Sequence, residues 1–302
     1  MQDFFHDIQM PLERCLTKMS YRGIKMDRGG IIDLSNEYRK QILLKEEELF
    51  TLCNQKFSYS SGSKDLPVVL YHDLKLPIIK RTPKSGAPST DKETLKELAK
   101  QHQAPALITK LRWYKNMLVK YLDGDDLTPE EERKPNLGFL CHLDENDRIH
   151  PPYLTVGTIS GRPSCPKPNI LNIPKLQEIR RLFITDEGWS FIDADYSQAE
   201  LVLLAYLAND PAFIEAVNSS DLHTATAKGL MKSEIVDDEV RRKAKGVNFL
   251  KAYGGGKKKL GERLKISVDE AREWLLKWDI TYPMVPLYKR EMQRKWLLEK
   301  RS

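Results

Sequence analysis

The sequence predicts an α+β fold, and three observations lead to this prediction. Apolar residues recur at helical spacing among dense charges in the first half of the chain and again after residue 198. The residues after Pro151 are rich in Thr, Gly and Pro, a texture typical of a strand followed by a long ordered loop. Between these regions the stretch FIDADYSQAEL, residues 191–201, ends a short apolar run in two aspartates and turns at once into a helical pattern.

The composition is that of an ordinary globular protein with an uneven distribution of charge. The 302 residues can bury a proper core in two or three modest domains or one large irregular one. The four cysteines are widely separated without a C-x-x-C pair, and neither a signal peptide nor a membrane-spanning apolar run occurs. We therefore expect a soluble protein of a reducing compartment. The formal charge of +6 is modest, so its distribution is more informative than its total.

Two segments of the first half predict long, exposed helices. One is SNEYRKQILLKEEELFTLCN, from Ser35, and the other is TDKETLKELAK, from Thr90, where Thr90 and Glu93 have the spacing of a capping box. The stretches between them, SYSSGSKDLPVV and LPIIKRTPKSGAPS, are rich in Ser, Gly and Pro and predict loops. Residues 29–150 are therefore expected to form a mainly helical unit.

Two further helices are predicted over roughly residues 198–207 and 238–253, and three glycines stop the second. On the second helix, cations and then aromatic residues follow one another at steps of four, and apolar residues form a separate arc. Such an order suits the phosphates and then the base or sugar of a nucleotide, with ordinary packing as the alternative. The cations and aromatic residues are Arg241, Lys245, Phe249 and Tyr253, and the apolar arc consists of Val240, Ala244, Val247 and Leu250.

The region around this helix is strongly basic. From Arg241 to Lys265 there are ten Lys or Arg residues and one acid, Glu262. A phosphate-binding surface and a solvated helix face both agree with such a run.

The two aspartates of residues 191–201 are candidates for a metal site. On a strand, Asp193 and Asp195 would point to the same face about 7 Å apart. Magnesium takes oxygen ligands and usually binds through one or two carboxylates plus substrate phosphates. The alternative is an ordinary strand end before a helix that Ser197 and Glu200 cap as a capping box.

Together these stretches resemble the family A DNA polymerases, the relatives of bacterial DNA polymerase I. DYSQAEL, from Asp195, resembles motif A, and RRKAKGVNFLKAYG, from Arg241, resembles motif B. TVGTISGRPSCPKPNILNIP, from Thr155, is similar to the family's T-G-R…P-N-L-Q-N-I-P signature, and DLHTATA, from Asp221, to its D-I-H-x-x-T-A segment. MPLERCLTKMSYRGIKMD, from Met10, resembles the beginning of the polymerase domain, so the resemblance covers nearly the whole chain.

The resemblance implies catalytic and metal-binding residues. Asp195 would hold the catalytic Mg²⁺ ions, two of them in the complete site, with the backbone carbonyl of Tyr196 as a further ligand. Arg241, Lys245 and His223 would contact the triphosphate of the incoming dNTP. Lys245 would also donate a proton to the leaving pyrophosphate. The catalytic candidates are therefore Asp195, Arg241 and Lys245, whereas Asp193 has no fixed role in the family.

The resemblance also implies contacts to sugar and DNA. Tyr253 and Glu200 would pack together beneath the sugar and exclude a 2′-hydroxyl group, with Phe249 beside the sugar. Arg162 would reach the minor groove at the primer end. Primer or template would also be contacted by Gln198, Asn169 and Asn172. The nucleotide-binding candidates are Gln198, Glu200, His223, Phe249 and Tyr253.

The fold implied is a partial right-hand polymerase with a helical thumb, an incomplete antiparallel palm sheet and truncated helical fingers. The chain departs from the family's pattern at Leu171, Val202 and Leu250, where relatives have Gln, Arg and Gly, and these changes concern template positioning more than the reaction. The expected domains are residues 1–28 as the start of the palm, 29–150 as the thumb, 151–208 as the palm with motif A, and 209–302 as incomplete fingers with motif B.

The family's motif C, whose His-Asp-Glu brings the second metal-binding aspartate, is not found. His72 and Asp73, in PVVLYHDLKL, imitate it but align with a thumb helix of the family. The reaction implied is in-line attack of a primer 3′-hydroxyl on the α-phosphate of a dNTP, with two metals on the attacking and leaving oxygens. The isolated chain is expected to be weak or inactive.

Three explanations for the missing motif remain open. The chain is part of a split polymerase whose second polypeptide carries motif C, or a fragment, or a non-catalytic module that binds primer-template or nucleotide. A single-subunit RNA polymerase is a further alternative, against which Glu200 and Phe249 argue. The expected partners are a DNA primer-template and dNTPs, without a membrane, and the expected location is the cytoplasm of a bacterial or phage-infected cell.

Overall fold

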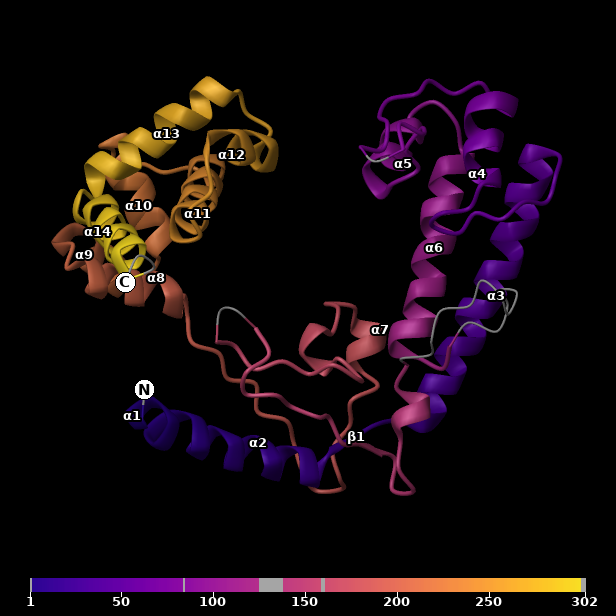
Figure 1. Cartoon of the computed structure of the whole chain (residues 1–302), viewed down its shortest axis with the longest axis horizontal. Helices are drawn as coiled ribbons and strands as arrows, with labels where there is room; N and C mark the ends of the chain where they lie inside the picture. Colours follow the sequence, from indigo (N-terminus) through magenta and orange to yellow (C-terminus); the bar gives the residue numbers. More distant parts are fainter. Residues whose placement is uncertain (1, 84, 125–137, 159–160, 300–302) are drawn as a thin grey trace. The chain divides into compact units, whose positions relative to one another are not determined.

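The computed structural model of the chain describes residues 2–83, 85–124, 138–158 and 161–299. It divides into two compact units, Met1–Phe191 and Ile192–Ser302, which are coloured from indigo to orange and from orange to yellow in Figure 1. Both units are mostly helical. Within the described ranges, regular strands are limited to β1 (Ile24–Lys25) and β2 (Arg148–Ile149), which pair antiparallel with Ile24 opposite Ile149. None of the described helices has the length and apolar character needed to cross a membrane.

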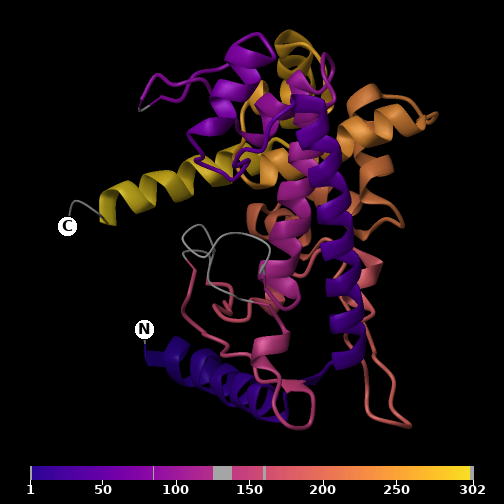
Figure 2. The same cartoon turned by 90° about the vertical axis from the view of Figure 1, so that its right-hand side faces the viewer.

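Unit Met1–Phe191 is built on two long helices, α3 (Arg28–Cys53) and α6 (Ala104–Tyr121), which lie side by side in Figures 1 and 2. Both contribute fully buried aliphatic side chains to one core, including Ile42 of α3 and Ile108 of α6. The unit also contains α1 (Gln2–Phe4), α2 (Met10–Arg22), α4 (Asp65–Val68), α5 (Lys92–Leu98), α7 (Gln177–Arg180), π-helical turns at Phe5–Gln9 and Val69–Asp73, and 3₁₀ turns at Leu140–His142 and Ile170–Asn172.

The two predicted helices of this unit are present as α3 and α5, but α5 is short, with seven residues, and one predicted cap is wrong. The Ser35 segment lies within α3, which begins seven residues earlier, at Arg28. In α5 the N-cap is Asp91, whose carboxylate accepts a hydrogen bond from the backbone N–H of Thr94 at 2.8 Å. Thr90 lies one residue too early to reach that donor. The expected capping box of Thr90 and Glu93 therefore does not form.

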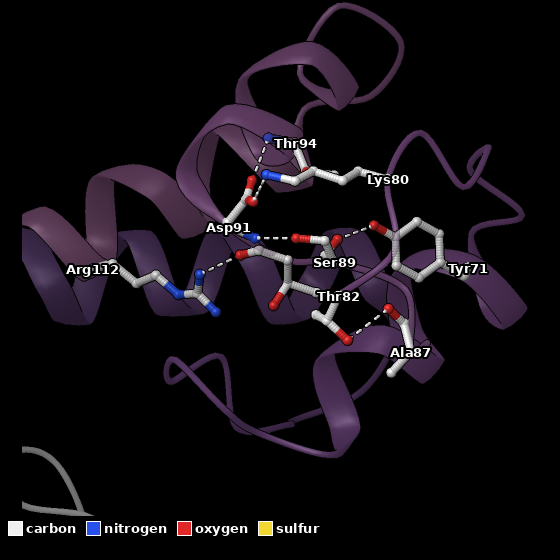
Figure 3. Close-up of polar contacts among 9 residues, drawn as sticks. Tyr71, Lys80, Thr82, Ala87, Ser89, Asp91, Thr94 and Arg112 are labelled. Atoms are coloured by element: carbon white, nitrogen blue, oxygen red, sulfur yellow. Dashed lines mark hydrogen bonds and ion pairs between the residues drawn. The ribbon is translucent and has the colours of Figure 1, made fainter. Parts of the chain in front are cut away.

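A partly buried arginine organises the loops that cover α6. Arg112 donates hydrogen bonds to the carbonyl groups of Tyr59, Thr90 and Ser60 at 2.7, 2.8 and 2.9 Å. Partial burial lowers the pKa of its guanidinium group, and the three carbonyl dipoles compensate the partly desolvated charge. Around it Figure 3 shows the bonds of Tyr71 to Ser89, Lys80 to Asp91 and Thr82 to Ala87.

Unit Ile192–Ser302 packs its helices around a second core. The rings of Phe213, Trp278 and Tyr282 meet at its centre with centroid distances of 4.6 to 5.5 Å. The helices predicted over residues 198–207 and 238–253 are confirmed as α8 and α11. The helices of this unit are α8 (Ala199–Ala208), α9 (Pro211–Asn218), α10 (Leu222–Met231), α11 (Asp238–Ala252), α12 (Lys257–Leu264), α13 (Val268–Thr281) and α14 (Met284–Glu299).

A single fully buried carboxylate serves two of these helices. Asp210 is the N-cap of α9, and its Oδ1 accepts a hydrogen bond from the backbone N–H of Phe213 at 3.0 Å. Its Oδ2 accepts a hydrogen bond from the backbone N–H of Met284, the first residue of α14, at 2.9 Å. Unpaired N–H groups at helix N-termini need such acceptors. Asp210 thus stabilises the first turn of α9 and of α14 at once.

Candidate functional site

Helix α11 has the two faces that its sequence predicts. Ala244, Val247 and Leu250 are buried, and Val240 packs against the same core, so the apolar arc is confirmed. The helix begins at its N-cap Asp237, whose carboxylate accepts from the backbone N–H of Val240 at 2.7 Å. The opposite side carries Arg241, Lys245, Phe249 and Tyr253, the residues expected to contact a nucleotide.

At the N-terminal part of this side, Arg241 is held by an acid of α10. Its Nε donates to Oδ2 of Asp221 at 2.6 Å. Asp221 is also the N-cap of α10, accepting from the backbone N–H of His223 at 3.0 Å. The guanidinium group holds the pKa of the Asp221 carboxyl well below its usual range, and the carboxylate raises the pKa of Arg241. Arg241 is therefore fixed beside the first turn of α10.

His223, in that first turn, lies almost completely buried beneath α11, with 4% of its surface exposed. Its ring centroid is 5.7 Å from that of Phe249. Burial lowers the pKa of the imidazole, and the nearby cations Lys245 and Arg241 lower it further, against the opposing effect of Asp221. The structure thus brings together the three residues expected at a triphosphate, and it keeps the histidine neutral near pH 7.

The basic run is partly neutralised within the unit. Lys243 pairs with Glu270 at 2.8 Å, and Lys251 pairs with Asp279 at 2.6 Å. Lys245 is exposed, and it has no ion-pair partner among the residues that the structure describes. Its ammonium group is therefore available to an anion from solution.

At the C-terminal end of α11, Tyr253 donates a hydrogen bond from its hydroxyl group to Oε2 of Glu200. The capping box expected from Ser197 and Glu200 is wrong, because Gln198 is the N-cap of α8 and makes no side-chain cap. Gln198 has a left-handed backbone with φ of 54°, which places Ser197 outside the cap position. Glu200 bonds across to α11 instead.

The expectation that Asp193 and Asp195 lie on a strand is also wrong. No strand is assigned between Phe191 and Tyr196, since none of the described residues pairs with this backbone, and a strand requires such a neighbour. Both aspartates and Tyr196 are exposed. In the described part of the chain, no group of three or more His, Cys, Asp or Glu residues is placed to hold a metal. The metal-binding role of Asp195 and Tyr196 stays a prediction.

The primer-template candidates fall in unit Met1–Phe191. Arg162, Asn169 and Asn172 are all exposed. The carbonyl of Asn172 accepts from the Tyr121 hydroxyl at 2.8 Å, which ties the 3₁₀ turn Ile170–Asn172 to the end of α6. Their roles in binding DNA stay predictions.

Three further side chains bear on these expectations. Gln198, in the other unit, carries a buried Oε1 for which no hydrogen-bond partner is found among the described residues. His72 and Asp73 are exposed residues of the π-helical turn Val69–Asp73 and bond to each other at 2.8 Å, in agreement with their assignment to a helix.

Sequence reasoning missed the polar residues behind the site. Asn248, Thr226 and Trp278 are fully buried and linked by hydrogen bonds to His223. The one available signal was Asn248 itself, a polar residue next to Val247 on the buried side of α11. A buried amide needs partners, so its position implied a polar network that the sequence could not identify.

Two cations on one side of a helix suit the oxygens of phosphate groups, so the site suits a phosphorylated ligand. Comparison with known proteins identifies the family. The family model described as DNA polymerase family A matches residues 30–300. The chain belongs to this family.

Individual relatives support the assignment over most of the chain. A DNA polymerase I of Caldicellulosiruptor bescii is 36% identical over 294 residues, covering 95% of this chain and 33% of the relative. A thermostable DNA polymerase I of Thermus thermophilus is 32% identical over 288 residues, covering 93% and 33%. The chain therefore spans about a third of the length of these relatives.

Among solved structures, the chain is similar to the POL domain of Pol1 from M. smegmatis in complex with DNA primer-template and dNTP. The TM-score is 0.75 at 28% identity, and the match covers 94% of this chain and 48% of the other. The mostly helical fold with a small antiparallel sheet thus agrees with part of a polymerase domain.

Proposed function

We propose that this chain takes part in template-directed DNA synthesis, the transfer of a nucleotide from a dNTP to a primer 3′-hydroxyl group. The observation that carries the proposal is the grouping of Arg241, Lys245 and His223 at the junction of α10 and α11, in a member of DNA polymerase family A. Two cations and a neutral donor suit the oxygens of a triphosphate. The relatives named above are DNA polymerases, and one was solved with primer-template and dNTP.

The cations bind and orient the triphosphate in this proposal. Arg241, held by Asp221, would contact the phosphates in a fixed position. Lys245 would approach the same group and protonate the pyrophosphate as it leaves. Phe249 would lie against the sugar, while Tyr253 and Glu200 would close the space that a 2′-hydroxyl group needs.

Enzymes of this family use divalent metal ions, and we propose Mg²⁺ here. The exposed carboxylate of Asp195 and the carbonyl of Tyr196 are oxygen donors of the kind that Mg²⁺ takes together with substrate phosphates. Two Mg²⁺ ions, when bound, would stabilise charge on the attacking and leaving oxygens. A site for two ions needs a further carboxylate, and we propose that a second polypeptide carrying motif C supplies it.

The DNA would be contacted by residues of both units. In unit Met1–Phe191, Arg162 would reach the minor groove at the primer end, with Asn169 and Asn172 nearby. In unit Ile192–Ser302, Gln198 of motif A would also contact primer or template. In this arrangement residues 1–28 begin the palm, residues 29–150 form the thumb, 151–208 form the palm around motif A, and 209–302 form fingers.

The test is primer extension by the purified chain with Mg²⁺ and all four dNTPs, alongside a gel shift of the same primer-template. We expect DNA binding with weak or no extension by the chain alone. Adding a polypeptide that carries motif C should restore extension. Asp195→Ala should then abolish it, whereas the matched variant Asp193→Ala should retain it.

Two results would change the proposal. Robust extension by the chain alone that depends on Asp195 would refute the need for a second polypeptide. Binding of primer-template without extension under any complementation would favour the alternative, a non-catalytic module that binds primer-template or nucleotide.

A further inference from the structure

A buried chain of hydrogen bonds links α13 to the candidate triphosphate site. Nε1 of Trp278, on α13, donates to Oδ1 of Asn248, on α11, at 2.8 Å. Nδ2 of Asn248 lies 3.2 Å from Nδ1 of His223 and 3.0 Å from Oγ1 of Thr226, both on α10. Trp278, Asn248 and Thr226 are fully buried. Water therefore does not compete for these groups.

The chemistry of the groups fixes the direction of every bond. An indole N–H can only donate, so the amide atom that faces Trp278 must be the oxygen of Asn248. The amide nitrogen of Asn248 then faces His223, and an amide nitrogen can only donate. Nδ1 of His223 must therefore accept. A neutral imidazole whose Nδ1 accepts carries its proton on Nε2.

The other ring nitrogen of His223 is left for a ligand. Nε2 has no hydrogen-bond partner among the described residues, and it is not one of their buried unpaired polar atoms. The charged groups that face the ring are Lys245 and Arg241 of α11 and Asp221 at the start of α10. The two cations disfavour a charged imidazole, and a phosphate group that they bind would lie near the ring.

We propose that Asn248, oriented by Trp278, is a positioning residue that holds His223 as the Nε2–H tautomer, so that His223 donates a hydrogen bond to a phosphate oxygen of the bound nucleotide. The phosphate contact rests on the proposed function, whereas the tautomer does not. An Asn248 amide turned the other way would present its oxygen to Nδ1 and draw the proton there. Nε2 would then be a lone-pair acceptor that repels phosphate oxygens.

The tautomer can be read directly by NMR of the full chain labelled with ¹³C and ¹⁵N in its histidines. The chain has 6 histidines, so His223→Gln identifies the signals of interest. The ring ¹⁵N and ¹³Cδ2 shifts distinguish the two neutral tautomers from the charged ring. We expect the Nε2–H form in the wild-type chain near pH 7.5.

Asn248→Asp is the decisive variant, because a carboxylate can only accept. One oxygen can still accept from Trp278, and the other requires a proton on Nδ1 of His223. We expect the pure Nε2–H signature to be lost and dNTP binding to weaken about tenfold above the pKa of the ring. If this variant does not fold, Trp278→Phe removes the donor that orients the amide and should give a mixture of tautomers.

Tyr282→Phe is the matched control. It removes the hydroxyl group that donates to Thr226 at 3.1 Å in the same network, without touching Asn248. We expect the tautomer and dNTP binding to remain as in the wild type. A wild-type ring with its proton on Nδ1, or an unchanged Nε2–H signature in Asn248→Asp, would overturn the proposal.

The tautomer of His223 and its contact with phosphate are tested separately. Addition of a dNTP should shift the Nε2 signal of His223 in the wild-type chain. An Nε2–H ring that no dNTP perturbs would refute the phosphate contact and weaken the proposed function, whereas the tautomer assignment would stand.

Discussion

Tyr253 and Glu200 lie 53 positions apart in the sequence, yet the hydroxyl group of the tyrosine donates a hydrogen bond to the carboxylate of the glutamate. This bond connects the end of α11 to the first turn of α8. Motif A and motif B, which the sequence gives as separate stretches, are therefore in direct contact through these two side chains.

The first prediction concerns this pair and the sugar of the nucleotide. Glu200→Ala should remove the carboxylate and leave space for a 2′-hydroxyl group, so discrimination against ribonucleotides should fall about tenfold or more. Tyr253→Phe keeps the ring and loses only the hydrogen bond, so its effect should be smaller. The measurement is the ratio of rNTP to dNTP affinity with primer-template present. An unchanged ratio in Glu200→Ala would leave the bond to Tyr253 a structural contact only.

The second prediction concerns the pH dependence of stability through Asp221. Arg241 holds the pKa of this carboxyl well below its usual range in the folded chain, while the unfolded value is about 3.9. A lowered folded pKa contributes stability that is present above the unfolded pKa and lost as the pH falls below about 4. Asp221→Asn should therefore be less stable than the wild type near pH 7, and the difference should shrink toward pH 3.

Asp221→Ala separates the charge from the helix cap. Asparagine still accepts from the first turn of α10, whereas alanine cannot, so Asp221→Ala should lose about 1 kcal/mol more of unfolding free energy. Urea unfolding of both variants across this pH range checks the assignment. A gap between Asp221→Asn and the wild type that does not change with pH would contradict the ion pair with Arg241.

The helices were predictable because their signals are local. Apolar periodicity predicted α8 and α11 to within about two residues, and the glycines after residue 253 marked the end of α11. The buried arc of α11 followed from the helical wheel. The caps were less predictable. Thr90 and Asp91 are both good cap residues, and only the backbone conformation of the loop decides between them.

The remaining features of the site depend on residues that are distant in sequence. The strand expected at Asp195 needs a neighbouring strand, a property that no local pattern carries. The bonds from Trp278 through Asn248 to His223 join residues 25 to 30 positions apart, and such contacts leave no periodic signal. The resemblance to a family supplied roles for residues, whereas the atoms that orient them come from the structure.

The third prediction concerns Lys289 of α14, which supports the end of α11. Its ammonium group donates to the carbonyl of Lys251 and, at 3.1 Å, to the carbonyl of Ala252, in the last turn of the helix. Lys289→Met keeps the stem and removes both bonds, so the unfolding free energy should fall by about 1–3 kcal/mol. Chemical denaturation measures this loss. Lys295→Met, on the exposed side of α14, is the control and should change stability by less than about 0.5 kcal/mol.

If Lys289 also fixes Tyr253, the residue after Ala252, the Lys289→Met variant should discriminate less well against ribonucleotides than the Lys295→Met control does. If Lys289→Met keeps the unfolding free energy and the ribonucleotide discrimination of the wild type, the end of α11 does not depend on Lys289.

The fourth prediction concerns Arg112 in the other unit. Arg112→Met leaves the partly buried carbonyls of Tyr59, Ser60 and Thr90 without their donor, and a lost hydrogen bond to a charged group costs about 1.5–3 kcal/mol. We expect a loss of about 2–3 kcal/mol in unfolding free energy and faster proteolysis of residues 58–63. Lys100→Met, at an exposed pair with Glu97, should have no measurable effect and serves as the control. Wild-type stability in Arg112→Met would contradict this role.

The shared cap at Asp210 has a consequence for how unit Ile192–Ser302 opens. Its two carboxylate oxygens hold the first turns of helices that begin 73 residues apart, at Pro211 and Met284. If the N-terminus of either helix detaches, one oxygen of the buried carboxylate loses its hydrogen-bond donor. The fraying of one helix is therefore coupled to the fraying of the other. Hydrogen exchange at Phe213 and Met284 should accordingly proceed in a single cooperative event, and the last helix behaves as part of the folding unit and not as an appendage.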